Sequence, residues 1–412
     1  MIMEELLRRR GHKIAGDPRE ADVIIINTCT VRSETEERML RRIKETSTVY
    51  REAKLVVAGC MAEAQPYTVR SVAPNATLLG PYSIDRVVEA VESSKPLVLL
   101  GGSDAKRDLV LPVHRGVIAV LALNDGCLGN CSFCITCRAR RMIMSRRPER
   151  IVEAVKKLVE NGVYEIQLSS QDAGAYGFDL VGKPLLPSLL EEILSRVEGE
   201  YAIRIAMMNP EWAMRMIDEL CEVMRDPRVY KFLHIPLQSG DDSVLKLMRR
   251  RYTVDEYRSL VKEFRSRIPD LYLVTDIMVG HPGEDEEAFE NTLRIVRELE
   301  FDRMHVARYT PRPFTLSARM KQVPDPVKKE RSRKLMKVYE EIGLRKNRAL
   351  LGRVLEAVVV EKTMIRGRAS FTARTSNYNS IVLLGDKVRL GDKVRVRVVG
   401  ATFFDLRGEV LG

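Results

Sequence analysis

The chain has 412 residues, 45% of them apolar, and its 68 Lys and Arg residues outnumber its 57 Asp and Glu residues to give a net charge of +11. This length is typical of two to four domains, and the apolar content excludes wholesale disorder. No apolar run is long enough for a membrane-spanning helix, and the early charges of MIMEELLRRRGHK do not fit a secretory signal. We therefore expect a cytoplasmic protein with no membrane partner, in which clustered cysteines serve metal or redox chemistry.

Residues 1–112 form the first predicted domain. Two short apolar runs in it, ADVIIIN at 21–27 and KLVVAG at 54–59, are each followed by a helical pattern. Strands that alternate with helices in this way predict an α/β domain with a doubly wound parallel sheet. The polar, turn-rich stretch 101–116 is expected to be a linker.

Cys29 and Cys60 each end one of these two strands. Because the carboxyl ends of parallel strands meet at one edge of a sheet, the two thiols are expected to lie close together. A single cysteine at such a position is more often a small buried hydrophobe than a ligand. Because two cysteines occupy matching positions, a functional role is as good an interpretation as a packing role.

Residues 113–348 form the second predicted domain, in which strands and helices alternate repeatedly. Helical patterns at 148–161 and 285–299 each present one apolar face. This alternation predicts a partial (βα)6 barrel, whose ligands bind at the carboxyl ends of the strands. The strands are expected at 117–123, 163–170, 201–207, 230–236, 271–279 and 303–309.

Residues 349–412, the third predicted domain, follow a charged helix expected at about 325–349. Apolar and polar residues alternate between Gly-Asp turns, which predicts a small antiparallel β-barrel. The stretch 350–412 holds 11 basic and 6 acidic residues. Basic side chains interleaved with aromatic ones suit single-stranded RNA, whereas the plainer alternative is a solvated face over a barrel core. These residues are Lys362, Arg366, Arg368, Arg374, Lys387, Arg389, Lys393, Arg395 and Arg397 with Phe371, Tyr378, Phe403 and Phe404.

The sequence NDGCLGNCSFC at 124–134 is the strongest chemical signal in the chain. It places Cys127, Cys131 and Cys134 in a C-x3-C-x2-C array directly after the first barrel strand. Three such thiolates can hold three irons of a [4Fe–4S] cluster and leave the fourth iron open. A structural zinc site is a poorer interpretation, because it needs a closed shell of ligands and no second C-x2-C pair occurs elsewhere in the chain.

Cys137 extends this array, and as a fourth ligand it would close the cluster and limit it to electron transfer. We favour the open cluster, with Cys137 beside it, because a barrel offers a substrate cavity that a ferredoxin lacks. Cys221 falls in an amphipathic helix expected over 211–224 and is assigned to the core.

These features resemble the radical S-adenosylmethionine (SAM) superfamily and, across nearly the whole chain, its methylthiotransferase family. Residues 350–412 resemble the TRAM domain, a small β-barrel that binds RNA. GCLGNCSFCIT and RIAMMNP look most like the archaeal and eukaryotic branch, whose substrate is N6-threonylcarbamoyladenosine in tRNA. The other motifs that carry the resemblance are INTCTVRSETEERM, VAGCMAEAQP, EIQLSSQDAGAYG, HIPLQSGDDSVLKLMRRRYT, TDIMVGHPGE and RYTPRPFTLSARM.

The resemblance implies that Cys127, Cys131 and Cys134 hold the cluster at which SAM is cleaved to a 5′-deoxyadenosyl radical. It also implies a second [4Fe–4S] cluster in the first domain, which carries the sulfur or methylthio group. Cys29 and Cys60 match two of its three cysteine ligands. No cysteine precedes Cys29 here, so either the start of the chain is assigned too late, which we favour, or the protein has lost that ligand.

Further residues at strand ends are implied as contacts to SAM or to the substrate. For each of them, a polar cap at the end of a strand is an equal alternative. The loop at PRPFT departs from the family, because Phe314 stands where glycine is usual. The implied contact residues are Ser169, Ser170, Gln171, Asp172, Gln238, Ser239, Asp276, Gly280 and Gly283.

The predicted function is SAM-dependent methylthiolation of C2 of threonylcarbamoyladenosine next to the tRNA anticodon. Its cofactors are SAM and two [4Fe–4S] clusters, and its partners are the anticodon stem-loop, an electron donor and a sulfur donor. Two alternatives stay open. One is methylthiolation of an aspartate in a ribosomal protein, and the other is a non-catalytic iron–sulfur protein that binds RNA.

Overall fold

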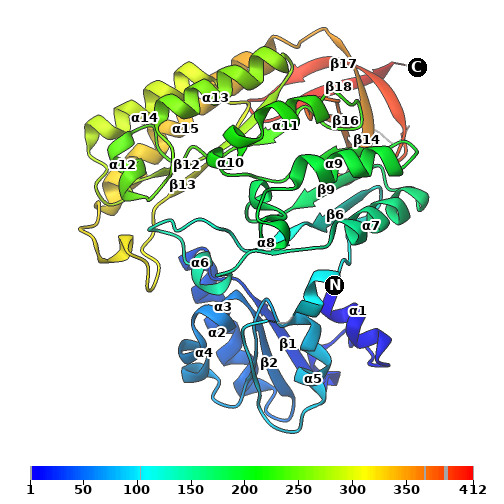
Figure 1. Cartoon of the computed structure of the whole chain (residues 1–412), viewed down its shortest axis with the longest axis vertical. Coiled ribbons are helices and arrows are strands. Elements are labelled where there is room, and N and C mark those ends of the chain that lie inside the picture. The colour runs from blue at the N-terminus through cyan, green and yellow to red at the C-terminus, as the bar shows by residue number, and fades with distance from the viewer. Residues whose placement is uncertain (1, 103, 366–367, 385–387, 412) are drawn as a thin grey trace. The chain divides into compact units, whose positions relative to one another are not determined.

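The computed structural model describes residues 2–102, 104–365, 368–384 and 388–411 (Figure 1). The chain divides into two compact units, each made of several segments. Unit 1 consists of Met1–Leu111, Asp125–Arg147 and Thr310–Arg319, and unit 2 consists of Pro112–Asn124, Pro148–Tyr309 and Met320–Gly412. The cysteine loop is therefore part of the same unit as the N-terminal sheet.

Unit 1 contains a parallel sheet in the order β1-β2-β3-β4. One face packs against Ile43 and Val69, and the other packs against Leu7 and Val87, so that helices cover both faces (Figure 1). This arrangement confirms the predicted doubly wound sheet. The elements are α1 (Ile2–Arg9), β1 (Val23–Thr28), α2 (Ser33–Val49), β2 (Lys54–Gly59), α3 (Cys60–Ala64), α4 (Pro66–Val72), β3 (Thr77–Leu79), α5 (Val87–Glu92), β4 (Val98–Leu99) and α6 (Thr136–Ala139).

Unit 2 contains the six predicted parallel strands, which supports the partial barrel. One sheet has the order β10-β9-β6-β5 and a second has the order β11-β12-β13. An isolated parallel bridge between Ile203 and Val229 joins the two sheets. The strands are β6 (Ile118–Ala122), β9 (Glu165–Ser169), β10 (Ala202–Arg204), β11 (Phe232–His234), β12 (Tyr272–Val279) and β13 (Arg303–Arg308).

The prediction of a linker at 101–116 is wrong for the last residues of that stretch. Val113–Arg115 forms β5, which pairs antiparallel with β6 and so lengthens the sheet at its edge. Two very short strands, β7 (Asn124–Asp125) and β8 (Met144–Ser145), pair with each other.

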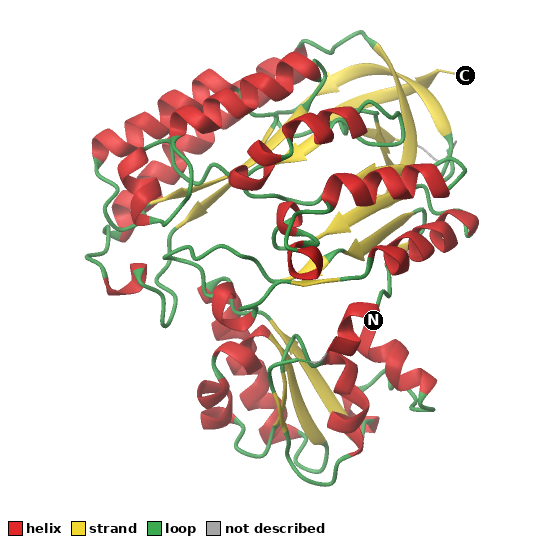
Figure 2. Ribbon diagram, viewed as in Figure 1, coloured by secondary structure: helices red, strands yellow, loops and turns green. Residues whose placement is uncertain are grey.

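Helices pack along the barrel strands (Figure 2). The helix predicted over 211–224 is two helices, because Met216 leaves the helical conformation with φ −127° and ψ 21°. Cys221 is buried, as predicted. The helices are α7 (Pro148–Glu160), α8 (Phe178–Val181), α9 (Leu186–Arg196), α10 (Pro210–Arg215), α11 (Ile217–Val223), α12 (Asp242–Leu247), α13 (Val254–Arg267), α14 (Glu286–Leu299) and α15 (Asp325–Arg348).

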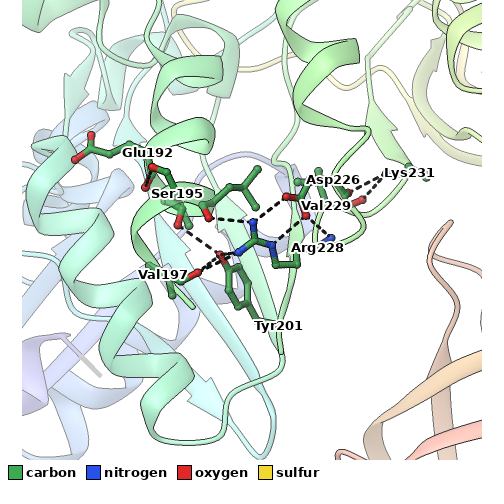
Figure 3. Close-up of polar contacts among 10 residues, drawn as sticks. Glu192, Ser195, Val197, Tyr201, Asp226, Arg228, Val229 and Lys231 are labelled. Carbon is green, nitrogen blue, oxygen red and sulfur yellow. Dashed lines mark hydrogen bonds and ion pairs between the residues drawn. The ribbon is translucent and has the colours of Figure 1, made fainter. Parts of the chain in front are cut away.

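Arg228 joins α9 to the loop ahead of β11 (Figure 3). Its guanidinium donates to the backbone oxygens of Leu194 (2.9 Å) and Val197 (3.1 Å) at the end of α9. Asp226 pairs with the same guanidinium at 2.8 Å. A cation at a helix C-terminus satisfies carbonyls that have no partner within the helix, so Arg228 stabilises this junction.

The C-terminal strands form the predicted small barrel, closed in the order β14-β15-β16-β18-β17. All neighbouring strands are antiparallel except β16 and β18, which run parallel. Its core includes Val359, Phe371, Ile381 and Val396. The strands are β14 (Val354–Ile365), β15 (Arg368–Arg374), β16 (Ser380–Leu384), β17 (Lys393–Ala401) and β18 (Leu406–Leu411).

Within the part of the chain that the structure describes, no helix is both long enough and apolar enough to cross a bilayer.

Candidate functional site

The loop that carries Cys127, Cys131 and Cys134 folds around Gly129. The Gly129 amide donates to the Sγ atom of Cys127 at 3.1 Å. A Cβ atom at Gly129 would lie 3.1 Å from the Cys127 Sγ atom and 3.8 Å from the Cys131 Sγ atom. The loop therefore leaves just enough room for a residue without a side chain between two of the predicted ligands.

The chemistry of the sulfur atoms fits an iron–sulfur cluster. All three thiols are partly buried, and hydrogen bonding from the Cys137 thiol lowers the pKa of Cys134, which favours the thiolate that a cluster needs. Among the described residues, no three cysteine sulfurs come within 4.8 Å of one another.

Cys137 lies on α6 beside the three predicted ligands. Its Sγ atom is 3.5 Å from the backbone oxygen of Gly129. The hydrogen bond to Cys134, and burial, raise the pKa of Cys137, so this thiol keeps its proton when Cys134 is ionised.

Cys29 and Cys60 follow neighbouring strands, as predicted. Thr28, at the end of β1, pairs in register with Gly59, at the end of β2. The Thr28 hydroxyl donates to the Ala58 oxygen at 2.6 Å and accepts from the Met61 amide at 3.3 Å. These bonds fix the two strand ends that lead to the cysteines.

Unit 1 brings the two cysteine sets together, although they are far apart in the sequence. Helix α3, which Cys60 begins, packs against α6 through Ala64, Ile135 and Ala139. Cys60 itself packs against this small apolar cluster. The first domain's cysteines and the array after β6 are thus parts of one structure.

A buried ion pair that the sequence analysis did not single out lies beside Cys29. The carboxylate of Glu36 accepts from Gln65 at 2.5 Å, from the Thr30 hydroxyl and from the guanidinium of Arg312. Arg312 also donates to the Thr30 backbone oxygen at 3.0 Å. Because Arg312 comes from the PRPFT motif, this network explains why that motif belongs to unit 1.

A second charged cluster precedes Cys127. Asp125 pairs with Lys106 at 2.8 Å, with Arg146 at 2.7 Å and with Arg140. Burial lowers the pKa of Lys106 to about 6. Only tertiary structure gathers these residues, and the two arginines that share one carboxylate leave a surplus of positive charge next to a loop suited to an anionic cluster.

Two of the predicted contacts after β9 are engaged with other residues of unit 2. Asp172 is fully buried and accepts from the backbone (3.0 Å) and side-chain (2.6 Å) nitrogens of Asn209. The Ser170 hydroxyl donates to Asn124 at 2.7 Å. Burial raises the pKa of Asp172. Ser169 remains exposed and Gln171 is partly exposed, so these two are accessible to a ligand.

The next predicted contacts lie after β11 and along β12. Gln238 has a φ of 71°, and its amide donates to the Asp276 oxygen at 2.8 Å. Ser239 is fully buried, and its hydroxyl has no partner among the residues that the structure describes. The Asp276 carboxylate lies 2.9 Å from His234 Nε2.

Gly280 and Gly283 have a packing reason to be glycine. Both have a positive φ, 74° and 94°. A Cβ atom would lie 2.3 Å from the side chain of Lys328 at Gly280 and 2.3 Å from that of Leu247 at Gly283. Their approach to an adenine ring stays a prediction.

The RNA-binding residues predicted in the C-terminal barrel divide into two groups. Arg374 and Tyr378 are wrong as RNA contacts, because both bind the buried Glu165 of β9, at 3.3 and 3.2 Å. Phe371 lies in the barrel core. The exposed members are Lys362, Arg389, Lys393, Arg395, Arg397 and Phe404. Arg366 and Lys387 lie outside the described residues.

Three family models match the chain. Residues 121–296 match the radical SAM superfamily, residues 1–80 match "Uncharacterized protein family UPF0004" and residues 348–411 match the TRAM domain.

Similar sequences come from archaea and animals. A probable threonylcarbamoyladenosine tRNA methylthiotransferase of Pyrococcus abyssi is 38% identical over all of this chain and 95% of that protein. The one of Methanocaldococcus jannaschii is 36% identical over all of this chain and 93% of that protein. The human threonylcarbamoyladenosine tRNA methylthiotransferase is 31% identical over 97% of this chain and 69% of that protein.

The fold also has relatives among solved structures. The radical SAM methyltransferase TsrM from Kitasatospora setae superposes with a TM-score of 0.55 and 13% identity, over 77% of this chain and 73% of that chain. At this identity the likeness concerns the fold alone.

Proposed function

The chain belongs to the threonylcarbamoyladenosine tRNA methylthiotransferase family of radical SAM proteins, and on this basis we propose its reaction, its ligands and its RNA surface. The reaction is the replacement of hydrogen by a methylthio group at C2 of N6-threonylcarbamoyladenosine next to the tRNA anticodon, in the cytoplasm. The observation that carries this proposal is the similarity to such enzymes over the full chain, with the cysteine array placed directly after β6.

Cys127, Cys131 and Cys134 hold a [4Fe–4S] cluster, and Cys137 stays a protonated neighbour. A cluster of this kind, with one iron open, binds SAM and supplies the electron that cleaves it to a 5′-deoxyadenosyl radical. The chain's own part is to keep the three thiolates in place around Gly129 and to donate from Cys137 to Cys134. The Asp125 cluster places positive charge beside this loop.

Cys29 and Cys60 hold part of the auxiliary cluster that provides the sulfur. The paired strand ends position the two cysteines, and the Glu36–Arg312 pair holds the Thr30 backbone next to Cys29. The packing of Cys60 against the cluster that includes α6 supports a short path for the sulfur within unit 1. A sulfur donor supplies the sulfur, one SAM molecule supplies the methyl group, and a second SAM molecule with an electron donor supplies the radical that removes the C2 hydrogen.

The RNA surface consists of the exposed cations of the C-terminal barrel. Arg395 and Arg397 alternate with the buried Val396 and Val398 along β17, so their side chains lie on the outer face of the barrel. Lys362 and Arg389 are also exposed. Such cations bind phosphates, and their contribution falls with salt concentration.

Anaerobic reconstitution tests the reaction. The wild-type protein is supplied with SAM, dithionite, sulfide and an anticodon stem-loop that carries threonylcarbamoyladenosine, and nucleosides are measured by mass spectrometry. We expect the 2-methylthio nucleoside, together with 5′-deoxyadenosine. The variant Cys131→Ala should form neither, and Cys221→Ala, at a buried position on α11, is the matched control.

Two results would contradict the proposal. Cleavage of SAM without any change in the RNA, together with a methylthio group on a ribosomal protein, would establish the protein substrate instead. A wild-type protein with a complete cluster that never cleaves SAM would establish the non-catalytic alternative.

A further inference from the structure

The inner face of strands β10 to β13 carries an unusual group of charged side chains. In register, His234, Val274 and Arg303 lie side by side on β11, β12 and β13. Asp276 and His305 form the next row on the same face. All of these residues belong to unit 2, so their arrangement does not depend on how the two units are placed.

Arg204, on β10, is a cation that makes no hydrogen bond or ion pair with the described residues, although the charge of the Glu165 carboxylate acts on it at longer range. Its guanidinium lies 4.6 Å from the ring centre of Phe232 and 5.6 Å from that of Tyr378. Its Nε atom is buried and, among the described residues, no acceptor binds it. The aromatic rings stabilise the charge only in part, because burial still lowers the pKa of Arg204.

A neighbouring arginine shows that the fold can provide a carboxylate partner for a buried guanidinium. Arg374 lies within the same aromatic cluster but pairs with Glu165 at 3.3 Å. Arg303, by contrast, has a ring contact with Phe404 at 4.1 Å and no hydrogen bond or ion pair among the described residues. Among the described residues, two guanidinium groups therefore approach this face without a hydrogen bond or ion pair to a carboxylate.

The histidines add donors to the same place. His234 Nε2 lies 2.9 Å from Asp276, and the rings of His234 and His305 are 5.5 Å apart. One ligand atom each from His234, Asp276 and His305 can lie within 4.8 Å of the others, a spacing that a divalent metal could also use. His305 is exposed, so a ligand can reach it.

Charge decides between a cation and an anion at this place. Arg204 and Arg303 are close enough that both act on the titration of His305. Two nearby positive charges disfavour a metal ion, and the two carboxylates that act on this region are already engaged, Asp276 with His234 and Glu165 with Arg374. The unsatisfied groups are donors that suit a carboxylate.

We propose that Arg204, His305 and the His234–Asp276 pair bind the threonyl side chain of the modified base, with Arg204 and His305 donating to its carboxylate. Asp276 accepts from the hydroxyl or the N–H groups of the same side chain. This assignment rests on the proposed function and names the part of the substrate that these residues read. Adenosine without this side chain lacks the anion that Arg204 needs, so the face discriminates for the threonylcarbamoyl group.

Binding to synthetic RNA tests the carboxylate contact. Three anticodon stem-loops are compared with the reconstituted wild-type protein: one with threonylcarbamoyladenosine, one with its methyl ester and one with adenosine. We expect the ester to bind about ten-fold to one-hundred-fold more weakly than the acid, the loss typical of a hydrogen-bonded charge. The adenosine loop should bind at least as weakly as the ester.

Two variants locate the contact. Arg204→Met keeps an apolar stem over the two rings and removes the charge, and His305→Gln changes an exposed side chain. Each should bind the acid and the ester with affinities that differ by about two-fold or less, while SAM cleavage to 5′-deoxyadenosine continues. Arg225→Gln, at an exposed position beyond α11, is the control and should keep the wild-type preference.

Other occupants give different results, and each of them overturns the inference. If the carboxylate of SAM occupies this face, the variants weaken SAM binding and leave the preference for the acid over the ester intact. If a metal ion occupies it, zinc or cobalt binds beyond the iron of the clusters and is lost in His305→Gln. A wild-type protein that methylthiolates acid and ester equally well overturns only this inference, whereas one that modifies neither RNA overturns the proposed function.

Discussion

Two arginines of unit 2 show how the same side chain serves different ends. Arg228 has a carboxylate, a phenol and two backbone oxygens around its guanidinium, and it also lies over the ring of Tyr201 at 5.4 Å. Arg204 lies against two rings and, within the described chain, makes no hydrogen bond or ion pair. A partly buried cation costs free energy unless acceptors offset the cost. The fold supplies these acceptors to Arg228, and we infer that a ligand supplies them to Arg204.

The largest effect is expected at a fully buried charge whose partners all come from the fold. Glu165 has no exposed surface and binds Arg374, Tyr230 and Tyr378. Glu165→Leu removes the carboxylate that accepts from the guanidinium and from two phenols, so we expect a loss of about 3–5 kcal/mol in the free energy of unfolding. Urea denaturation measures this loss. The exposed Glu160→Gln should change the free energy by less than about 0.5 kcal/mol, and an equal effect of both would refute the assignment.

A buried histidine that stays neutral makes the free energy of unfolding depend on pH. Burial lowers the pKa of His281 to about 4 from an ordinary value of 6.5. Between these values the unfolded chain takes up a proton that the folded chain refuses, so stability falls as the pH falls.

We expect His281 to account for about 2 kcal/mol of the free energy of unfolding that is lost between pH 7.5 and pH 5. His281→Phe, which keeps a ring against Tyr309, should show a smaller loss over that range in urea denaturation. The exposed His114→Gln serves as the control. A variant with the same pH dependence as the wild type would show that the pKa of His281 does not differ between the folded and unfolded states.

The two arginines can be compared directly by the same substitution. Arg228→Met removes the hydrogen bonds to the end of α9, and we expect a loss of about 1–2 kcal/mol in the free energy of unfolding. The preference for the acid over the ester should stay at the wild-type value. An Arg228→Met variant that loses the preference for the acid but keeps its stability would contradict the assignment of a structural role to Arg228 and a binding role to Arg204.

Arg204→Met should have the smallest effect on stability. Because no acceptor within the described chain loses a donor, we expect the free energy of unfolding to change by less than about 0.5 kcal/mol, or to rise. Thermal and urea unfolding of the variant and the wild type measure the difference. A loss as large as that of Arg228→Met would mean that Arg204 is satisfied by the fold.

Local patterns predicted much of the fold. Alternation of apolar residues predicted the six barrel strands, the N-terminal sheet and the C-terminal barrel, because these elements bury one face or both. It missed the strand Val113–Arg115, whose exposed residues carry no apolar pattern. It also merged α10 and α11, because the apolar face continues across the break at Met216.

The cysteine positions of the candidate site could also be predicted from local sequence patterns. The cysteine array at 127–134 and the strand-end positions of Cys29 and Cys60 are visible as short spacings and strand ends. The Glu36–Arg312 pair, the Asp125 cluster and the inner-face charges were not visible. Their members are 276, 21 and about 100 residues apart, and no local period links them.

The sequence by itself determined the ligands that one short loop contributes and the kind of protein that carries them. Only the tertiary structure decided that Arg374 and Tyr378 pack on Glu165, that Cys60 lies against the helix of Cys137, and that Arg204 has no ion-pair partner among the described residues. The physical reason is that the hydrogen-bond and ion-pair partners of a charged side chain come from distant parts of the chain. The free-energy cost of leaving that charge unpaired depends on how deeply the fold buries it.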